Sequence, residues 1–142
     1  MRRAVAFAEA RSIKIHGKSD WNGMRAAGRL AAETLDYITP FVVPGVRTDE
    51  LDRLCEAFIR KHGAVPAPLN YRGFPKSICT SINHVVCHGI PGEKRLQDGD
   101  IVNIDVTTIL DGWFGDTSRM YCAGKAGVKA QRLIDVTFEA MW

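Results

Sequence analysis

Apolar residues near the start of the chain recur at three- and four-residue steps, the period of a helix with one buried face. The first such segment predicts a helix from about residue 20 to residue 38, with Ser19 or Asp20 as its N-cap. Pro40 and the turn at Pro44 and Gly45 follow it and account for its end. The residues expected on its buried face are Met24, Ala27, Ala31, Leu35 and Ile38.

A second segment predicts a helix that Thr48 caps and that ends near Gly63. Asp49 and Glu50 in its first turn favour this interpretation, because the helix dipole stabilises anions at the N-terminus. The apolar stripe expected on this helix consists of Leu51, Leu54, Cys55, Phe58 and Ile59.

The two ends of the chain differ in their pattern. Residues 1–18 show no sustained period, so we expect an extended arm before a domain formed by residues 19–142. A last helix is predicted from about Val128, where apolar residues again have helical spacing. No glycine, proline or basic last turn precedes Trp142, so we expect the chain to end inside this helix.

Frequent proline and glycine between residues 64 and 100 separate short β-prone runs, of which residues 77–82 and 85–88 are the clearest. Such loop-rich segments tend to display functional side chains. Two longer β-prone runs then flank Asp111 and Gly112. These two residues are the preferred pair for a two-residue hairpin turn, because both positions require positive φ. The sequence therefore predicts a β-hairpin that begins at about residue 101.

The turn fixes the register of this hairpin. Leu110 and Trp113, which flank the turn, lie opposite each other, and this determines every other cross-strand pair. Thr107 then lies opposite Asp116, and Ser118 opposite Asp105. Side chains on a strand alternate between faces, so these four residues share one face. Asp105 and Asp116 become diagonal neighbours, roughly 7–8 Å apart at the backbone. The residues on the opposite, apolar face of the first strand are Val102, Ile104 and Val106.

Two like charges side by side on paired strands are unfavourable unless something compensates them. A divalent cation, or a pair of them, is the natural compensator, because carboxylate oxygens suit hard and borderline metals. The alternative is an exposed hairpin with two solvated aspartates, which the spacing alone does not exclude. The apolar opposite face and the adjacent Trp113 and Phe114 indicate an internal hairpin and favour the metal site.

Composition narrows the class of protein. The chain has 142 residues, 46% of them hydrophobic and 25% charged, with a net charge of +3, which is ordinary for one globular domain. Its four cysteines form no CxxC pair, so free thiols in a reducing cytoplasm are favoured over a disulfide framework or a zinc finger. No apolar run approaches the roughly 20 residues that span a bilayer. The basic residues near the start lack interleaved aromatics, which argues against a nucleic-acid substrate.

Four motifs along the chain closely resemble those of type I methionine aminopeptidases. They are LNYRGFPKSICTSIN at residues 69–83, VVCHGIP at 85–91, DGDIVNIDV at 98–106 and DGWFGDTS at 111–118. The resemblance runs from about residue 13 to the end of the chain. The CHGIP form differs from type II enzymes and from the related prolidases, aminopeptidase P and creatinases.

The resemblance implies an α/β (α+β) fold, the pita-bread fold, with this chain as its N-terminal half. Two pseudo-symmetric halves, each an antiparallel sheet covered by helices, would hold two divalent ions between them. Asp105 and Asp116 would be metal ligands, with Asp116 bridging both ions, and His88 would contact the scissile amide of the substrate. The residues that would line the pocket for the methionine side chain are Tyr71, Phe74 and Cys79.

The activity implied by the resemblance is removal of the initiator methionine from nascent proteins by metal-activated water. In the substrate, the residue after the methionine would be small. The enzyme would be a cytoplasmic monomer that meets nascent chains at the ribosome surface and uses cobalt, manganese, iron, zinc or nickel. The family's further ligands, one histidine and two glutamates, and its second substrate-facing histidine have no match in this chain. We therefore expect residues 1–142 alone to bind metal weakly and to turn over no substrate.

Other interpretations of the same residues remain open. His88 could cap the turn that follows it, and Tyr71 and Phe74 could be ordinary core aromatics. A second hypothesis is a non-catalytic binding protein on the same scaffold, but the intact Asp105, Asp116 and His88 argue against it. A third is a half-length chain that dimerises, although a dimer would duplicate the aspartates without supplying the glutamates.

Overall fold

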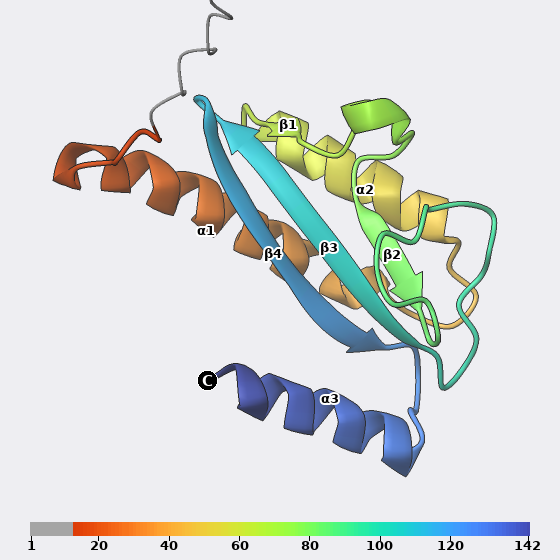
Figure 1. The fold of residues 1–142 in the computed structure, drawn as a ribbon. Coiled ribbons are helices and arrows are strands. Elements are labelled where there is room, and N and C mark those ends of the chain that lie inside the picture. The colour runs from red at the N-terminus through yellow and green to blue at the C-terminus, as the bar shows by residue number, and fades with distance from the viewer. Residues whose placement is uncertain (1–12) are drawn as a thin grey trace, which may run out of the picture.

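Figure 1 shows the computed structural model of the protein, which describes residues 13–142. Helices pack against an antiparallel sheet, so the predicted mixed class is confirmed. Most of the arm expected at residues 1–18 lies outside the described residues. In chain order the elements are η1 (Lys18–Asp20), α1 (Trp21–Ile38), η2 (Thr39–Phe41), α2 (Thr48–Lys61), β1 (Val65–Pro66), η3 (Tyr71–Gly73), β2 (Cys79–Ile82), β3 (Ile101–Leu110), β4 (Trp113–Cys122) and α3 (Val128–Met141).

Strand β3 is the centre of the sheet, and every other strand pairs with it in antiparallel orientation. β4 pairs with β3 along its whole length. β1 and β2 are short and pair with different parts of β3, β1 near its end and β2 near its start. The long hairpin β3–β4 therefore carries the sheet, and the shorter strands extend its other edge.

Helices α1 and α2 cover one face of this sheet (Figure 1). Side chains on β3 alternate accordingly: Val102, Ile104 and Val106 are fully buried, whereas Asp105 and Thr107, on the other face, are only half-buried. The apolar face of the hairpin thus packs under the helices as predicted. The opposite face of the sheet, which carries the two carboxylates, is free of α1 and α2.

Strand β4 approaches α1 closely at Gly115. A Cβ atom on this glycine would lie 2.1 Å from the carbonyl oxygen of Ala27. That same carbonyl accepts a hydrogen bond of 3.1 Å from the buried hydroxyl of Thr108. Glycine is thus required where the strand crosses the helix, and the hairpin and α1 are joined there by both packing and a buried hydrogen bond.

The helix starts agree with the predictions only in part. Asp20 is the N-cap residue of α1, as predicted, but its side chain makes no capping hydrogen bond; its carboxylate accepts a hydrogen bond from the amide of Gly17, at 3.2 Å. Thr48 is the first residue of α2 and not its cap; its hydroxyl is directed to Gly92, donating to the carbonyl at 3.0 Å and accepting from the amide at 2.9 Å. Met24, expected in the core, is half exposed. At Thr48, a contact with a distant segment of the chain overrides the local capping signal.

Helix α3 follows the sheet and has no buried residue. It begins at Val128, as predicted, and extends along the lower side of the molecule in Figure 1. None of the helices within residues 13–142 is long and apolar enough to cross a bilayer. The exposed large apolar residues of this segment are Val128, Leu133, Val136, Phe138, Met141 and Trp142.

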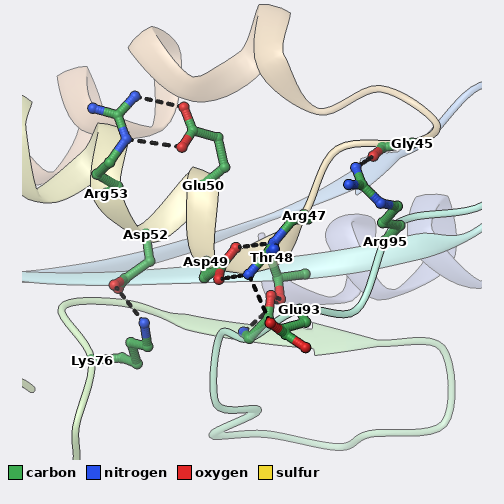
Figure 2. A network of polar contacts seen from close by, with 11 residues as sticks. Gly45, Arg47, Thr48, Asp49, Glu50, Asp52, Arg53, Lys76, Glu93 and Arg95 are labelled. Atoms are coloured by element: carbon green, nitrogen blue, oxygen red, sulfur yellow. Dashed lines mark hydrogen bonds and ion pairs between the residues drawn. The ribbon is translucent and has the colours of Figure 1, made fainter.

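Ion pairs surround the first turns of α2 (Figure 2). Arg47 precedes the helix and donates from Nε to Oδ1 of Asp49 at 2.9 Å, while a second guanidinium, that of Arg95, donates to the carbonyl of Gly45 at 2.7 Å. Contacts of this kind at the protein surface are screened by solvent and contribute little to stability. Their main effect is to hold the loop before α2 against residues 92–96.

Asp52 is the buried member of this network, with its side chain only 7% exposed. Its Oδ1 accepts hydrogen bonds from the backbone amides of Ser77, at 2.8 Å, and Ile78, at 3.1 Å. Lys76 lies 3.8 Å away and partly compensates the charge. Burial nevertheless raises the pKa of Asp52 above its ordinary value. The carboxylate thus fixes the segment that leads into β2.

Replacing Asp52 with alanine should lower the free energy of unfolding by about 3 kcal/mol, because two buried amides lose their acceptor. Asp52→Asn keeps an oxygen for both amides and should change stability by less than about 1 kcal/mol. Since burial raises the pKa of Asp52, the wild type should lose stability relative to Asp52→Asn as pH rises from about 4 to about 7. Urea unfolding at both pH values measures this difference; a constant difference would contradict the expectation.

Candidate active site

A cavity of about 740 Å³ brings together side chains from four separate segments of the chain. The segments are the loop around η3, the start of β2, the loop at residues 88–90 and the β3–β4 hairpin. All six residues proposed from the sequence line it: Tyr71, Phe74, Cys79, His88, Asp105 and Asp116.

The hairpin register is the predicted one. Asp111 and Gly112 form the turn and both have positive φ, 49° and 80°. Thr107 is paired with Asp116, and Asp105 lies between Ser118 on β4 and Cys79 on β2. The two carboxylates therefore lie on the same face of adjacent strands, directed toward the cavity.

The carboxylates differ in their surroundings. Asp105, on the central strand, is half-buried, whereas Asp116 is exposed. Burial is the main cause that raises the pKa of Asp105, and the negative charge of Asp116 adds to it, while His88 acts in the opposite direction. The pair is thus a site of uncompensated negative charge, since among residues 13–142 neither aspartate forms an ion pair with lysine or arginine.

Cys79 lines the cavity and is paired with Asp105 across β2 and β3. Burial, followed by the charge of Asp105, raises the pKa of its thiol to about 11. The thiol is therefore protonated at neutral pH and presents a soft, neutral surface. Its position follows from the hydrogen bonds that Asp52 accepts from the two residues before it.

His88 reaches the cavity from a loop, although the sequence favoured a strand at residues 85–88. Its backbone has a positive φ of 53°, which ends the extended run. Gly89 then lies directly on β2: its carbonyl accepts the amide of Thr80 at 2.8 Å, and its amide donates to the hydroxyl of Ser81 at 3.2 Å. A side chain on Gly89 would collide with Thr80, since its Cβ would lie 2.1 Å from the carbonyl oxygen. These contacts hold the exposed imidazole at the cavity.

The loop around η3 presents Tyr71 and Phe74. Three of its residues, Asn70, Arg72 and Gly73, have positive φ, and the amide of Asn70 donates to the carbonyl of Phe74 at 2.8 Å. Tyr71 is 64% exposed, so it is not the core aromatic of the alternative interpretation. The cavity residues that the sequence reasoning did not single out are Ala67, Pro68, Arg72, Gly73, Pro75 and Ile90. Phe114 was named only as a sign of an internal hairpin, although strand alternation could have placed it at the site, because it is two positions from Asp116.

Comparison with known proteins gives the family. The model of metallopeptidase family M24 matches residues 22–142. The chain belongs to metallopeptidase family M24. Within this family it is 67% identical to the methionine aminopeptidase of Rickettsia prowazekii over 130 residues, and 54% identical to that of Escherichia coli K12 over 133 residues. Each match covers 92% of this chain, which spans about half the length of these curated relatives.

Solved structures of M24 enzymes share the fold. The crystal structure of the R. prowazekii methionine aminopeptidase superposes with a TM-score of 0.90, covering 92% of this chain and 52% of that one. The methionine aminopeptidase of Thermotoga maritima, at 31% identity, gives a TM-score of 0.86 with 90% and 52% coverage. The pita-bread fold expected from the resemblance is thus confirmed for this half.

M24 enzymes are metallopeptidases, and the donors in this cavity fit a divalent ion. Asp105 and Asp116 offer carboxylate oxygens, which divalent ions accept as ligands, and no lysine or arginine of residues 13–142 forms an ion pair with either of them. Within residues 13–142, however, no three His, Cys, Asp or Glu side chains gather into a complete metal site. The two aspartates are the residues of this cavity that could hold such an ion.

Proposed function

We propose that this chain supplies one half of the active site of a type I methionine aminopeptidase, which removes the initiator methionine from nascent proteins. The observation that carries the proposal is the convergence of both aspartates, His88 and the pocket residues on one cavity. The high identity to methionine aminopeptidases over 92% of the chain supports the same activity. Two divalent ions would serve it, with cobalt, manganese, iron, zinc and nickel as the candidates.

Asp105 and Asp116 would hold the ions, with Asp116 as the ligand shared between them. Such ions supply Lewis acidity, which polarises a peptide carbonyl and lowers the pKa of water toward neutrality. The exposed Asp116 is accessible from the cavity, while Asp105 is anchored in the central strand. The sheet thereby sets the spacing of the two ligands before any metal binds.

The other cavity residues would bind and orient the peptide. The imidazole of His88 can donate a hydrogen bond at the scissile amide and stabilise the charge that develops on its oxygen. Tyr71, Phe74 and the protonated thiol of Cys79 offer a soft apolar surface, which suits a flexible thioether side chain. The second residue of the bound peptide, a small one, would lie outside the methionine pocket.

The proposal places this work in the cytoplasm, at the ribosome surface, in a monomeric enzyme. The four cysteines of the chain are all free thiols, which is compatible with a reducing compartment. Residues 1–142 carry two of the expected ligands and should bind metal weakly and hydrolyse no substrate by themselves.

Metal titration of the chain tests the two assigned ligands. Calorimetry with manganese or cobalt should show weak binding that falls at least about tenfold in Asp105→Asn and in Asp116→Asn, because a lost ligand should cost no less than a lost outer-shell partner. Asp111→Asn is the matched control, since Asp111 lies on the same hairpin but in its exposed turn. Equal affinity in all four proteins would refute the assignment.

A further inference from the structure

Arg72 is a cationic residue at the same cavity that neither the motifs nor the metal proposal uses. It lines the cavity together with Tyr71 and both aspartates, and it is exposed. Its guanidinium lies over the ring of Tyr71, with Cζ 5.4 Å from the ring centroid. Stacking of this kind orients the planar guanidinium while leaving its N–H donors available.

The backbone holds this arginine in an uncommon conformation. Arg72 has φ 48° and ψ 33°, the left-handed region that side chains with a Cβ rarely adopt. Hydrogen bonds on both sides impose it: the amide of Tyr71 donates to the carbonyl of Pro68 at 2.9 Å, and the amide of Asn70 donates to that of Phe74 at 2.8 Å. Left-handed positions held in this way are concentrated at ligand-binding sites.

The charge of Arg72 has no carboxylate partner within residues 13–142. It forms no ion pair and no side-chain hydrogen bond there, although the cavity contains two carboxylates. Other arginines of the described chain do form such pairs, among them Arg47, Arg53, Arg60 and Arg119. With Asp105 and Asp116 assigned to metal, the guanidinium is left to bind an anionic group of the ligand.

We propose that Arg72 is a specificity-determining residue that binds a carboxylate of the peptide, downstream of the methionine. The planar fork of a guanidinium matches a carboxylate with two parallel hydrogen bonds. A tripeptide can offer this group in two ways, as its C-terminus or as an acidic third side chain. The inference rests on the proposed function, because it takes the cavity as the peptide site.

The experiment uses the isotopically labelled chain of 142 residues with zinc chloride, titrated with three peptides and followed by NMR. The peptides are Met-Ala-Ser with a free carboxylate, Met-Ala-Ser amide and Met-Ala-Asp amide. The free acid should bind about fourfold more tightly than its amide, as expected for one exposed charge pair. Tighter binding of Met-Ala-Asp amide would assign the preference to a side-chain carboxylate as well.

Variants separate this effect from general changes. Arg72→Gln should abolish the difference in affinity between the free acid and its amide, and Arg72→Lys should retain part of that difference. Arg29→Gln, on α1 and outside this cavity, should keep the full preference. Equal affinity for acid and amide in the wild type, or an unchanged preference in Arg72→Gln, would overturn the inference alone. Failure of every peptide to bind would overturn it together with the proposed function.

Discussion

Joined to the half of the R. prowazekii methionine aminopeptidase that it does not match, this chain should release methionine from Met-Ala-Ser. Asp116→Asn in the joined protein should lower kcat/KM about 1,000-fold, because a bound metal contributes several kcal/mol to catalysis and Asp116 is assigned to both ions. The high identity and the TM-score of 0.90 indicate that the two halves would fit. Released methionine, measured by mass spectrometry, gives the rate.

Two controls make this result specific. Asp111→Asn changes an acidic residue of the same hairpin at its exposed turn and should leave the rate within about twofold, as for surface substitutions generally. The unjoined chain should release no methionine. Full activity of the Asp116→Asn protein would contradict the assignment of the metal site, and turnover by residues 1–142 alone would contradict the expectation that this half is inactive by itself.

Gly115→Ala should lower the free energy of unfolding by about 3 kcal/mol or more. The new methyl group would lie 2.1 Å from the carbonyl oxygen of Ala27 and 2.6 Å from the amide nitrogen of Gly28, and these are backbone atoms that cannot rotate away. Strand and helix must separate to admit it, which disturbs the packing between them. Urea denaturation followed by circular dichroism measures the loss.

The adjacent helix provides a control of opposite sign. Gly28 lies inside α1, and a Cβ there would meet nothing within 4 Å. Gly28→Ala should therefore stabilise the protein by about 0.5–1 kcal/mol, because alanine favours the helix over the unfolded chain. If both substitutions had similar effects, the close approach at Gly115 would not be the cause.

Local signals in the sequence were sufficient for the parts of the fold that depend on neighbouring residues. Periodicity located α1, α2 and α3, and the Asp111–Gly112 turn determined the whole register of β3 and β4. The register in turn placed Asp105 and Asp116 on one face. Each of these features is decided by spacing within a single segment, which a sequence displays directly.

The features that the sequence did not reveal depend on contacts between distant segments. Thr48 was expected to cap its own helix but bonds to Gly92, and residues 85–88 were expected to form a strand but turn back onto β2. Asp52, one of the charged residues of α2, gave no sign that it would anchor the entrance to β2. Only the tertiary structure brings such partners together.

The missing side chain at Gly115 also excludes the wrong pairing of the hairpin. A slip of β4 by one residue would exchange its two faces and direct Asp116 at the backbone of Ala27, where only a hydrogen atom fits. That arrangement would bury an acid against the helix and leave a glycine toward the cavity. Two features therefore set the direction of the Asp116 side chain: the turn at Asp111 and Gly112, which fixes the pairing of β3 with β4, and Gly115, which fits only against α1.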